Sequence, residues 1–316
     1  MPAVVTFGES MALFRADPGE ALRTAHRFSR SIAGAESNVA IGLARLGCEA
    51  GWFGRVGDDP LGLGILDTLR GEGVDVSRAI VDPDAPTGVL VRDTHAERRI
   101  DVVYARLQSA GSRLTAADVD PAYLASARVL HVTGITPALS PQAREATTEA
   151  VRLAAAAGVA VSFDPNIRRR LWPDLDVARR ELLLLAQRSQ LVLVGHAEAT
   201  VLTGEDEPAR AARWLADQGV ETVAVKLGAA GALGFRDGEI YQGAALAVYP
   251  ADPIGAGDAF DAGFLAAWLR GGGLRDCVDE GNLAAGLSVQ VCGDIEGLPY
   301  RREMDERRVN NTEANR

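Results

Sequence analysis

The sequence predicts an α/β fold in which helices cover both faces of a parallel sheet, with a small second sheet attached. From residue 129 onward, short and nearly uninterrupted apolar runs alternate with longer helical patterns. Such runs are typical of parallel strands that are buried between two layers of helices. Residues 11–33 and 86–106 break this rhythm, because they carry strand-like patterns without a helix. These two segments predict the second sheet.

The first half of the body opens with a β-branched run, residues 4–7, which ends at Gly8 and predicts a buried strand. The helix expected over residues 37–46 has apolar residues on one face, and Gly47 supplies a C-terminal stop. The remaining elements before residue 86 are a strand at 51–56, a helix at 60–71 and an extended segment at 74–81.

The second half repeats strand and helix in regular order. One helix starts at Ser140-Pro141, where a capping residue precedes a proline at the first helical position, and ends at Gly158. The other expected elements are strands at 129–133, 159–163, 191–194 and 222–226, helices at about 176–188 and 208–218, a hairpin turning at Asp237-Gly238, and a long helix from near Gly257. Ligands collect at the carboxyl ends of parallel strands. The residues at such ends are Gly8, Gly134, Asp164, Gly195 and Lys226.

The second sheet is expected to contain an antiparallel pair, residues 87–93 and 99–106, with a turn at 95–98. From the pattern alone, this sheet fits either a lid over a substrate or an ordinary edge hairpin. The polar residues 301–316 predict a frayed C-terminal tail. We assign residues 1–10, 34–85 and 107–316 to the α/β body and residues 11–33 and 86–106 to the small sheet.

Composition and charge exclude several classes of protein. The chain has 316 residues, of which 47% are hydrophobic and 24% charged, the balance of a soluble globular protein. A net charge of −10 and a pI of about 5.0 argue against nucleic acid or an anionic membrane as a partner. Signal-peptide and membrane-span patterns are not visible, so we expect a cytoplasmic protein. Cys48, Cys277 and Cys292 are scattered, and we expect neither a disulfide nor a zinc site.

The most informative motif is Asp252-Pro-Ile-Gly255-Ala256-Gly257-Asp258, which leads into an apolar helix. A glycine-rich turn at a helix start points several backbone N–H groups in one direction and forms an anion site suited to a phosphoryl group. A carboxylate would repel an anion at this site, so the presence of Asp258 needs a chemical explanation. Asp258 fits a general base that accepts a proton from an attacking alcohol. The alternative is a simple helix cap by Asp258. We favour the active centre of a small-molecule kinase.

A second motif, Gly34-Ala35-Glu36-Ser37-Asn38, stands just before the first expected helix. Small residues there let a ligand approach the backbone closely, and the amide of Asn38 offers both donors and an acceptor to a polyol. The alternative is a plain helix N-terminus with an exposed Asn38. The P-loop class of kinase is excluded, because the sequence has no Walker A motif.

Together the two motifs resemble the N- and C-terminal signatures of the ribokinase-like (PfkB) sugar kinases. The resemblance extends over nearly the whole chain and is closest to the 2-keto-3-deoxygluconate kinases. It implies a ribokinase-like three-layer, Rossmann-like domain with a small β-sheet lid, and ATP and Mg²⁺ as cofactors. Further matching segments are Ser109-Ala-Gly-Ser112, residues 133–140, Asp164-Pro-Asn-Ile-Arg168, Leu171-Trp172, Gly293-Asp294, Gly297 and Pro299-Tyr300.

The resemblance also implies which residues bind the sugar. A 2-keto-3-deoxy sugar acid carries a carboxylate, and arginine binds a carboxylate in two parallel charge-assisted bonds. Arg106 and Arg168 are the expected carboxylate ligands. The expected sugar contacts are Gly34, Ala35, Glu36, Ser37, Asn38, Leu90, Tyr104, Arg106, Arg168, Asp258 and Asp294.

For catalysis and the nucleotide, the resemblance implies an anion hole at Gly255, Ala256 and Gly257, with Asp258 as base and Arg168 stabilising charge. Glu198 matches the family acid that helps to hold Mg²⁺, through water. The expected nucleotide contacts are Asn166, Arg168, Lys226, Gly228, Gly231, Gly255, Ala256, Gly257 and Asn282. A monovalent cation site near the anion hole is left open.

Four positions depart from the family pattern. Ala33 replaces the first glycine of the N-terminal signature, and Pro253 replaces the usual threonine after Asp252. Gly195 stands where the family has Asn or Ser, which removes a polar side chain near the metal. Leu90 stands where related sugar-acid kinases have a tyrosine, so one hydrogen bond to the substrate is lost and the sugar preference is open.

These observations predict an ATP-dependent kinase that phosphorylates 2-dehydro-3-deoxy-D-gluconate at its 6-hydroxyl, with Asp258 as general base. One alternative is a kinase of a neutral sugar such as fructose or ribose. Another is a non-catalytic sensor of a sugar acid on the same fold. We expect a homo-oligomer, a dimer or higher, because lid sheets of this family commonly pair.

Overall fold

The computed structural model describes residues 1–94 and 100–314. Within them, an eight-stranded sheet has the order β14-β13-β12-β11-β10-β9-β1-β4. The strands from β4 to β12 are parallel, and β13 and β14 extend the sheet as the predicted antiparallel hairpin. Their bounds are β1 (Val4–Phe7), β4 (Ala50–Phe53), β9 (Val129–Thr133), β10 (Ala160–Asp164), β11 (Leu191–Gly195), β12 (Thr222–Lys226), β13 (Ala232–Arg236) and β14 (Glu239–Gly243).

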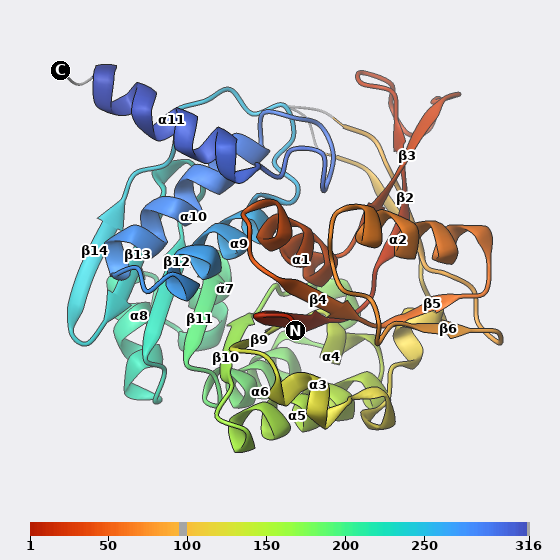
Figure 1. Cartoon of the computed structure of the whole chain (residues 1–316), viewed down its shortest axis with the longest axis horizontal. Coiled ribbons are helices and arrows are strands. Elements are labelled where there is room, and N and C mark those ends of the chain that lie inside the picture. The colour runs from red at the N-terminus through yellow and green to blue at the C-terminus, as the bar shows by residue number, and fades with distance from the viewer. Residues whose placement is uncertain (95–99, 315–316) are drawn as a thin grey trace.

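Helices cover both faces of this sheet, as Figure 1 shows. Neighbouring strand residues point to opposite faces, so Val4 packs in one hydrophobic core and Val5 in the other. One face is covered by α1 (Ala35–Arg45), α2 (Pro60–Gly71), α9 (Ala256–Leu269) and α10 (Leu274–Ser288). The other is covered by α3 (Pro121–Ala125), α5 (Pro141–Ala156), α6 (Leu175–Ala186), α7 (His196–Thr203) and α8 (Pro208–Asp217). The predicted three-layer α/β architecture is therefore confirmed.

The two segments that break the rhythm form one four-stranded sheet, with the order β3-β2-β7-β8. Its strands are β2 (Met11–Ala16), β3 (Phe28–Ala33), β7 (Val89–Arg92) and β8 (Val102–Ala105). The predicted antiparallel pair is confirmed by β7 and β8, whereas the turn predicted at residues 95–98 lies outside the described residues. Strands β2 and β3 project beyond the body at the upper right of Figure 1.

The single strand predicted at residues 51–56 is wrong, because the chain forms two strands there. It leaves the main sheet after β4, and β5 (Arg55–Gly57) pairs instead with β6 (Ile80–Asp82). Gly54 lies at the break, where a Cβ atom would come within 2.2 Å of the carbonyl oxygen of Gly8. Only glycine allows so close an approach of the two backbones. Of the extended segment predicted at 74–81, only the last residues enter a strand.

The frayed tail predicted for residues 301–316 is also wrong, since α11 (Arg301–Ala314) is a helix. Its composition is polar, but Met304 is fully buried in the core. The guanidinium of Arg301 pairs with the buried carboxylate of Glu280 in α10 at 3.2 Å, which fixes the first turn of α11 to the body. Within residues 1–94 and 100–314, every helix falls short of the length and hydropathy that a membrane span requires.

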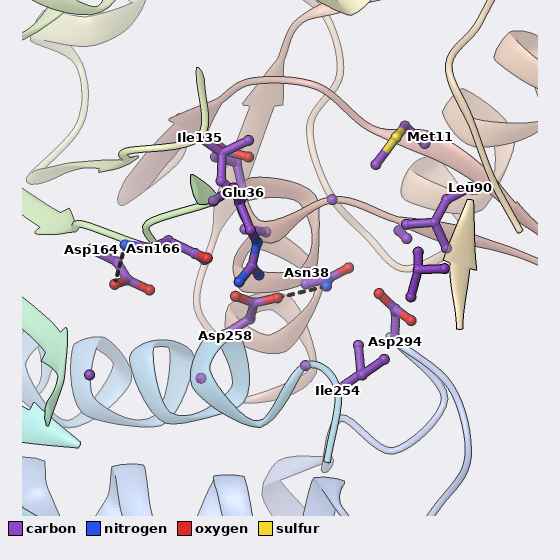
Figure 2. A pocket seen from close by; sticks show the side chains of 18 of the residues that line it. Met11, Glu36, Asn38, Leu90, Ile135, Asp164, Asn166, Ile254, Asp258 and Asp294 are labelled. Atoms are coloured by element: carbon purple, nitrogen blue, oxygen red, sulfur yellow. Dashed lines mark hydrogen bonds between the residues drawn. The ribbon is translucent and has the colours of Figure 1, made fainter. Parts of the chain in front are cut away.

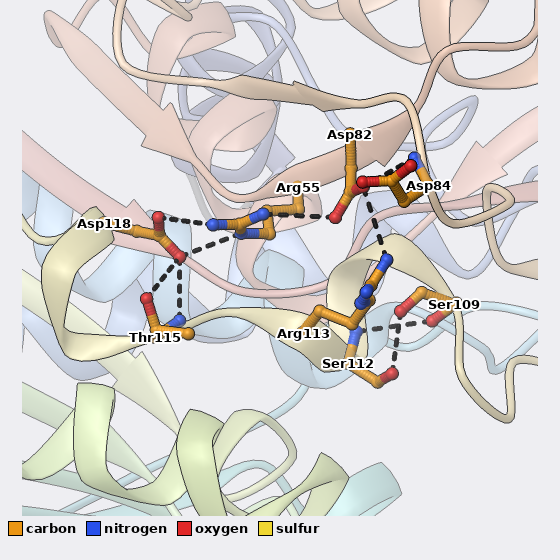
Figure 3. Close-up of polar contacts among 8 residues, drawn as sticks. All are labelled: Arg55, Asp82, Asp84, Ser109, Ser112, Arg113, Thr115 and Asp118. Carbon is orange, nitrogen blue, oxygen red and sulfur yellow. Dashed lines mark hydrogen bonds and ion pairs between the residues drawn. The ribbon is translucent and has the colours of Figure 1, made fainter.

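A polar network holds the segment that returns from β8 to the body (Figure 3). Arg55 of β5 bridges Asp82 of β6, at 3.1 Å, and Asp118, at 2.7 Å. Asp118 in turn accepts hydrogen bonds from the backbone N–H and the hydroxyl of Thr115. These contacts hold η2 (Ala116–Asp118), and Arg113 at the end of η1 (Ala110–Arg113) pairs with Asp82 at 3.4 Å. Ser109 precedes η1, and its hydroxyl donates to Glu9, which lines the cavity described next.

Candidate active site

A cavity of about 590 Å³ lies at the carboxyl edge of the main sheet, between the N-terminus of α9 and the small sheet. The body contributes the ends of β10, β11 and β12 together with the first turn of α1. The small sheet contributes Leu90, Tyr104 and Arg106. The small sheet therefore covers the cavity as a lid, and the alternative of an ordinary edge hairpin is set aside.

Most of the predicted site residues meet in this cavity, although they come from distant parts of the sequence. Those that line it are Gly34, Ala35, Glu36, Asn38, Leu90, Tyr104, Arg106, Asn166, Arg168, Glu198, Lys226, Gly255, Gly257, Asp258 and Asp294. Five predicted residues do not line it: Ser37, Gly228, Gly231, Ala256 and Asn282. For Ser37 the reason is plain, since its hydroxyl donates to Ser10 Oγ and to the Gly34 carbonyl, each at 3.0 Å. The Ser37 hydroxyl is thus used within the protein, and a contact of Ser37 with the substrate stays a prediction.

The predicted anion hole lies where the chain enters α9. Gly255 has a left-handed backbone with φ of 81°, and a Cβ atom there would lie 2.9 Å from the carbonyl oxygen of Asp294. Both the positive φ and the close carbonyl oxygen favour glycine at this position. The first turn of α9 has no side-chain cap. The N–H of Ala256 makes only a long hydrogen bond of 3.4 Å to the Pro253 carbonyl, and the N–H of Gly257 is available to bind an anion. The alternative that Asp258 merely caps the helix is therefore wrong.

Asp258 lies in the middle of the cavity, as Figure 2 shows, between Asp164 and Asn166 at one end and Leu90, Met11 and Asp294 at the other. Its Oδ2 accepts a hydrogen bond of 2.8 Å from Nδ2 of Asn38. Burial raises the pKa of Asp258 to about 7, and the hydrogen bond from Asn38 opposes this rise. A carboxylate with this pKa is suited to take a proton from an alcohol near neutral pH.

Two buried oxygens of cavity-lining residues near Asp258 have no hydrogen-bond partner among the described residues. Glu36 is fully buried, and its Oε1 accepts hydrogen bonds from the hydroxyls of Thr133, at 2.6 Å, and Thr136, at 2.7 Å. Among the described residues, Glu36 Oε2 and Asn38 Oδ1 have no hydrogen-bond partner. Buried polar atoms are rarely left unsatisfied, so both oxygens are suited to bind hydroxyl groups of a ligand.

Lys226, the single lysine of the chain, carries a buried positive charge at the other end of the cavity. Its Nζ pairs with Asp164 at 3.0 Å and with Asp261 at 3.1 Å. Burial would lower the pKa of Lys226, but these two carboxylates together with Glu198 raise it above its usual value. The ammonium is therefore charged, and Nζ lies 3.6 Å from the position of a Cβ atom on Gly257.

Glu198 is held in a fixed orientation at the same end. Its Oε1 accepts the N–H of Ile167 at 2.7 Å, and its Oε2 accepts the N–H of Gly195 at 3.1 Å. Gly195, which has no side chain, therefore contacts Glu198 through its backbone N–H. Burial and the nearby Asp164 raise the pKa of Glu198. Glu198 is therefore not an ordinary surface acid.

Sequence reasoning missed two buried charged residues of the cavity. Glu9 lies two residues beyond the end of β1; it accepts a hydrogen bond from the Ser109 hydroxyl and pairs with the guanidinium of Arg106. The strand-end rule that singled out Gly8 could have found it. The second residue is Arg92 of β7, which pairs with Asp294 at 3.0 Å. No local pattern marks an arginine within a strand as part of a site.

The fold and this cavity define a phosphotransferase of small molecules that carry an alcohol group. Residues 1–301 match the model of the pfkB family of carbohydrate kinases, and the chain belongs to that family. The chain is 43% identical to the 2-dehydro-3-deoxygluconokinase of Bacillus subtilis, over 95% of this chain and 93% of that protein. It is 40% identical to the 2-dehydro-3-deoxygluconokinase of Thermoproteus tenax, over 97% and 94% respectively.

A solved structure supports the same assignment. A protein from Escherichia coli assigned as a ribokinase II, crystallised with ATP and Mg²⁺, superposes with a TM-score of 0.90 at 26% identity. The superposition covers 97% of this chain and 98% of that protein. The fold is therefore ribokinase-like, and the chain is a carbohydrate kinase.

Proposed function

We propose that this kinase transfers the γ-phosphoryl group of ATP to the 6-hydroxyl of 2-dehydro-3-deoxy-D-gluconate. The observation that carries the proposal is the position of Asp258, a buried carboxylate with a pKa of about 7, next to the anion hole at the centre of the cavity. The names of the two relatives at 43% and 40% identity support this choice of sugar acid.

The sugar acid binds at the lid end of the cavity. Its hydroxyls meet the unpaired oxygens of Glu36 and Asn38, and its carboxylate meets arginine. Arg106 is 12% exposed in its side chain and already pairs with Glu9, which fixes the guanidinium before the substrate arrives. Arg168 is exposed and close enough to Asp258 to lower the pKa of that carboxyl. A planar guanidinium held in this way binds a carboxylate through its remaining N–H groups.

In the reaction, the ionised Asp258 accepts the proton of the substrate hydroxyl as the oxygen attacks the γ-phosphoryl group. The side chain of Asn38 holds that carboxylate in position through the 2.8 Å hydrogen bond. The N–H groups at the start of α9 and the guanidinium of Arg168 stabilise negative charge on the transferred group. The lid excludes water that would otherwise hydrolyse ATP.

The nucleotide binds at the opposite end, near Asn166 and Lys226. Gly228, Gly231 and Asn282 remain predicted contacts of the adenosine, although they lie outside the lined cavity. Asn282 in α10 is close to β14, since its Nδ2 would lie 2.9 Å from a Cβ atom on Gly243. This Nδ2 has no hydrogen-bond partner among the described residues, which fits a contact with a ligand.

The residues at this end fit a magnesium ion that arrives with ATP. Among the described residues, no group of three or more His, Cys, Asp or Glu side chains could hold a metal alone. Both oxygens of Glu198 accept backbone N–H groups, so Glu198 would hold the ion through water. Bound Mg²⁺ neutralises charge on the β- and γ-phosphate oxygens. A dimer or higher oligomer stays a prediction, as does the role of a monovalent cation.

The test is ADP production with Mg-ATP and a panel of 2-keto-3-deoxygluconate, 2-keto-3-deoxygalactonate, 2-ketogluconate, fructose and ribose. We expect the highest kcat/KM with 2-keto-3-deoxygluconate. Preference for fructose or ribose would retain the kinase and reject the sugar acid. If no member of the panel increases ADP formation, the proposed function is contradicted.

A further inference from the structure

Arg92 is among the largest fully buried side chains of the described residues, with 1% of its surface exposed. It lies on lid strand β7, but its guanidinium points into the body, where it contacts Asp252 and Asp294. Nη2 donates to Oδ2 of Asp252 at 2.7 Å and to Oδ1 of Asp294 at 3.0 Å. Nη1 donates to the carbonyl of Asp93 at 3.3 Å and to the hydroxyl of Thr94 at 3.2 Å. One end of the guanidinium thus holds the lid, and the other holds the body.

The two carboxylates that Arg92 joins belong to the segments on either side of the anion hole. Asp252 begins the loop that leads to Gly255, and it accepts the N–H groups of Ile254 and Gly293, each at 3.1 Å. The backbone carbonyl of Asp294 faces Gly255 directly, since a Cβ atom there would lie only 2.9 Å away. A shift of either segment would therefore move the N–H groups that form the anion hole.

Charge makes this contact strong. Asp252 is fully buried and the Asp294 side chain is only 9% exposed, so each carboxylate needs a partner inside the protein. Arg92 supplies one positive charge to both. An arginine suits this position better than a lysine, because its planar fork donates in two directions, whereas an ammonium is a single point of charge.

We propose that Arg92 is a positioning residue that clamps the lid to the anion hole by bridging Asp252 and Asp294. Its guanidinium is used within the protein and does not bind the carboxylate of the substrate, which is the role proposed for Arg106 and Arg168. The clamp places β7, and with it the sugar end of the cavity, at a fixed distance from the N-terminus of α9. This inference rests on the proposed phosphoryl transfer.

The test compares Arg92→Ala and Arg92→Lys with Arg30→Ala, which removes an exposed arginine from lid strand β3. Wild-type turnover with the sugar panel is measured first, because failure there rejects the proposed function and not the clamp. We then expect Arg92→Ala to lower kcat by about 100-fold, the scale of a small misplacement of reacting groups, with a much smaller change in KM. Arg92→Lys should lose less, about tenfold, and Arg30→Ala should keep normal turnover.

Chemical rescue separates a clamp from a general loss of stability. We expect guanidinium chloride at low millimolar concentration to restore part of the kcat of Arg92→Ala, and potassium chloride at equal ionic strength to restore none. Hydrogen exchange should become faster both in β7 and at residues 293–296 in this variant, and guanidinium should slow it again. Normal kcat in Arg92→Ala, equal rescue by potassium, or faster exchange in the lid alone would overturn the proposal.

Discussion

The amide Nδ2 of Asn38 donates a hydrogen bond of 2.8 Å to Oδ2 of Asp258, although 220 residues separate the two in the sequence. This bond joins the first turn of α1 to the first turn of α9. Each turn carries one of the two glycine-containing motifs, so the contact brings both motifs into one cavity. It also fixes the orientation of the carboxylate that we assign as general base.

Asp258→Asn tests that assignment. The amide cannot accept the substrate proton, so we expect kcat to fall by at least 100-fold, within the range of about 10²–10⁴ for general bases. Substrate binding measured by calorimetry should remain nearly normal, because the side chain keeps its shape. Asp67→Asn, on an exposed position of α2, is the matched control and should leave turnover unchanged. Near-normal kcat in Asp258→Asn would reject the role of Asp258 as general base.

The pH dependence of kcat/KM gives an independent test. Because burial raises the pKa of Asp258 to about 7, this group loses its charge as the pH falls through 7 in the free enzyme. We expect kcat/KM to decrease about tenfold per pH unit below pH 7 and to level off above it. A profile that stays flat down to pH 5 would contradict the assignment.

Ionisation of Asp258 is expected to raise activity but to lower the stability of the folded protein. Its pKa rises from 3.8 in the unfolded chain to about 7 in the folded protein, so its contribution to stability is present below pH 4 and is lost as the pH rises through 7. Asp258→Asn cannot ionise. We therefore expect this variant to exceed the wild type in Tm by a few degrees at pH 8, and by much less at pH 5. Equal differences at both pH values would disprove the raised pKa.

Lys226→Met should strongly destabilise the protein, because it leaves Asp164 and Asp261 buried without their shared cation. Breaking a buried ion pair on one side typically costs about 3–5 kcal/mol. Denaturant unfolding measures this loss. Adding Asp261→Asn to the variant removes one of the stranded charges and should recover part of the stability. If Lys226→Met unfolds like the wild type, the ammonium is not the charge that balances these acids.

Arg106→Gln should discriminate between acidic and neutral sugars. Removing a charge-assisted hydrogen bond costs about 1.5–3 kcal/mol, so the KM for 2-keto-3-deoxygluconate should rise about 10- to 100-fold. The KM for a neutral sugar, where turnover is detectable, should change little. Arg169→Gln, on an exposed neighbour of Arg168, serves as the control. An equal rise for both kinds of sugar would show that Arg106 does not bind the carboxylate.

Much of the site follows from the sequence because parallel strands bring their carboxyl ends to one edge. Asp164 ends β10 and Lys226 ends β12, with β11 between them, and the predicted strands placed both residues at this edge. Glu9 obeys the same rule, as it follows β1, but its role depends on Arg106, which lies far along the chain. Such a pairing is visible only in the folded structure.

Contacts between distant charges could not be predicted. Arg92 is 160 residues from Asp252 and 202 residues from Asp294, and nothing near it in the sequence indicates burial. The same holds for α11, a helix of polar composition that buries Met304 in the core. Local patterns describe the faces of single elements, whereas these contacts depend on how the elements are assembled.

The most direct test of the central claim is ³¹P NMR of a mixture of the enzyme, Mg-ATP and 2-dehydro-3-deoxy-D-gluconate. We predict a new phosphomonoester signal that is coupled to the two protons at C6 and grows in step with ADP, and that is at least 100-fold slower to form with Asp258→Asn. Phosphate at another carbon, or release of inorganic phosphate alone, would contradict the account.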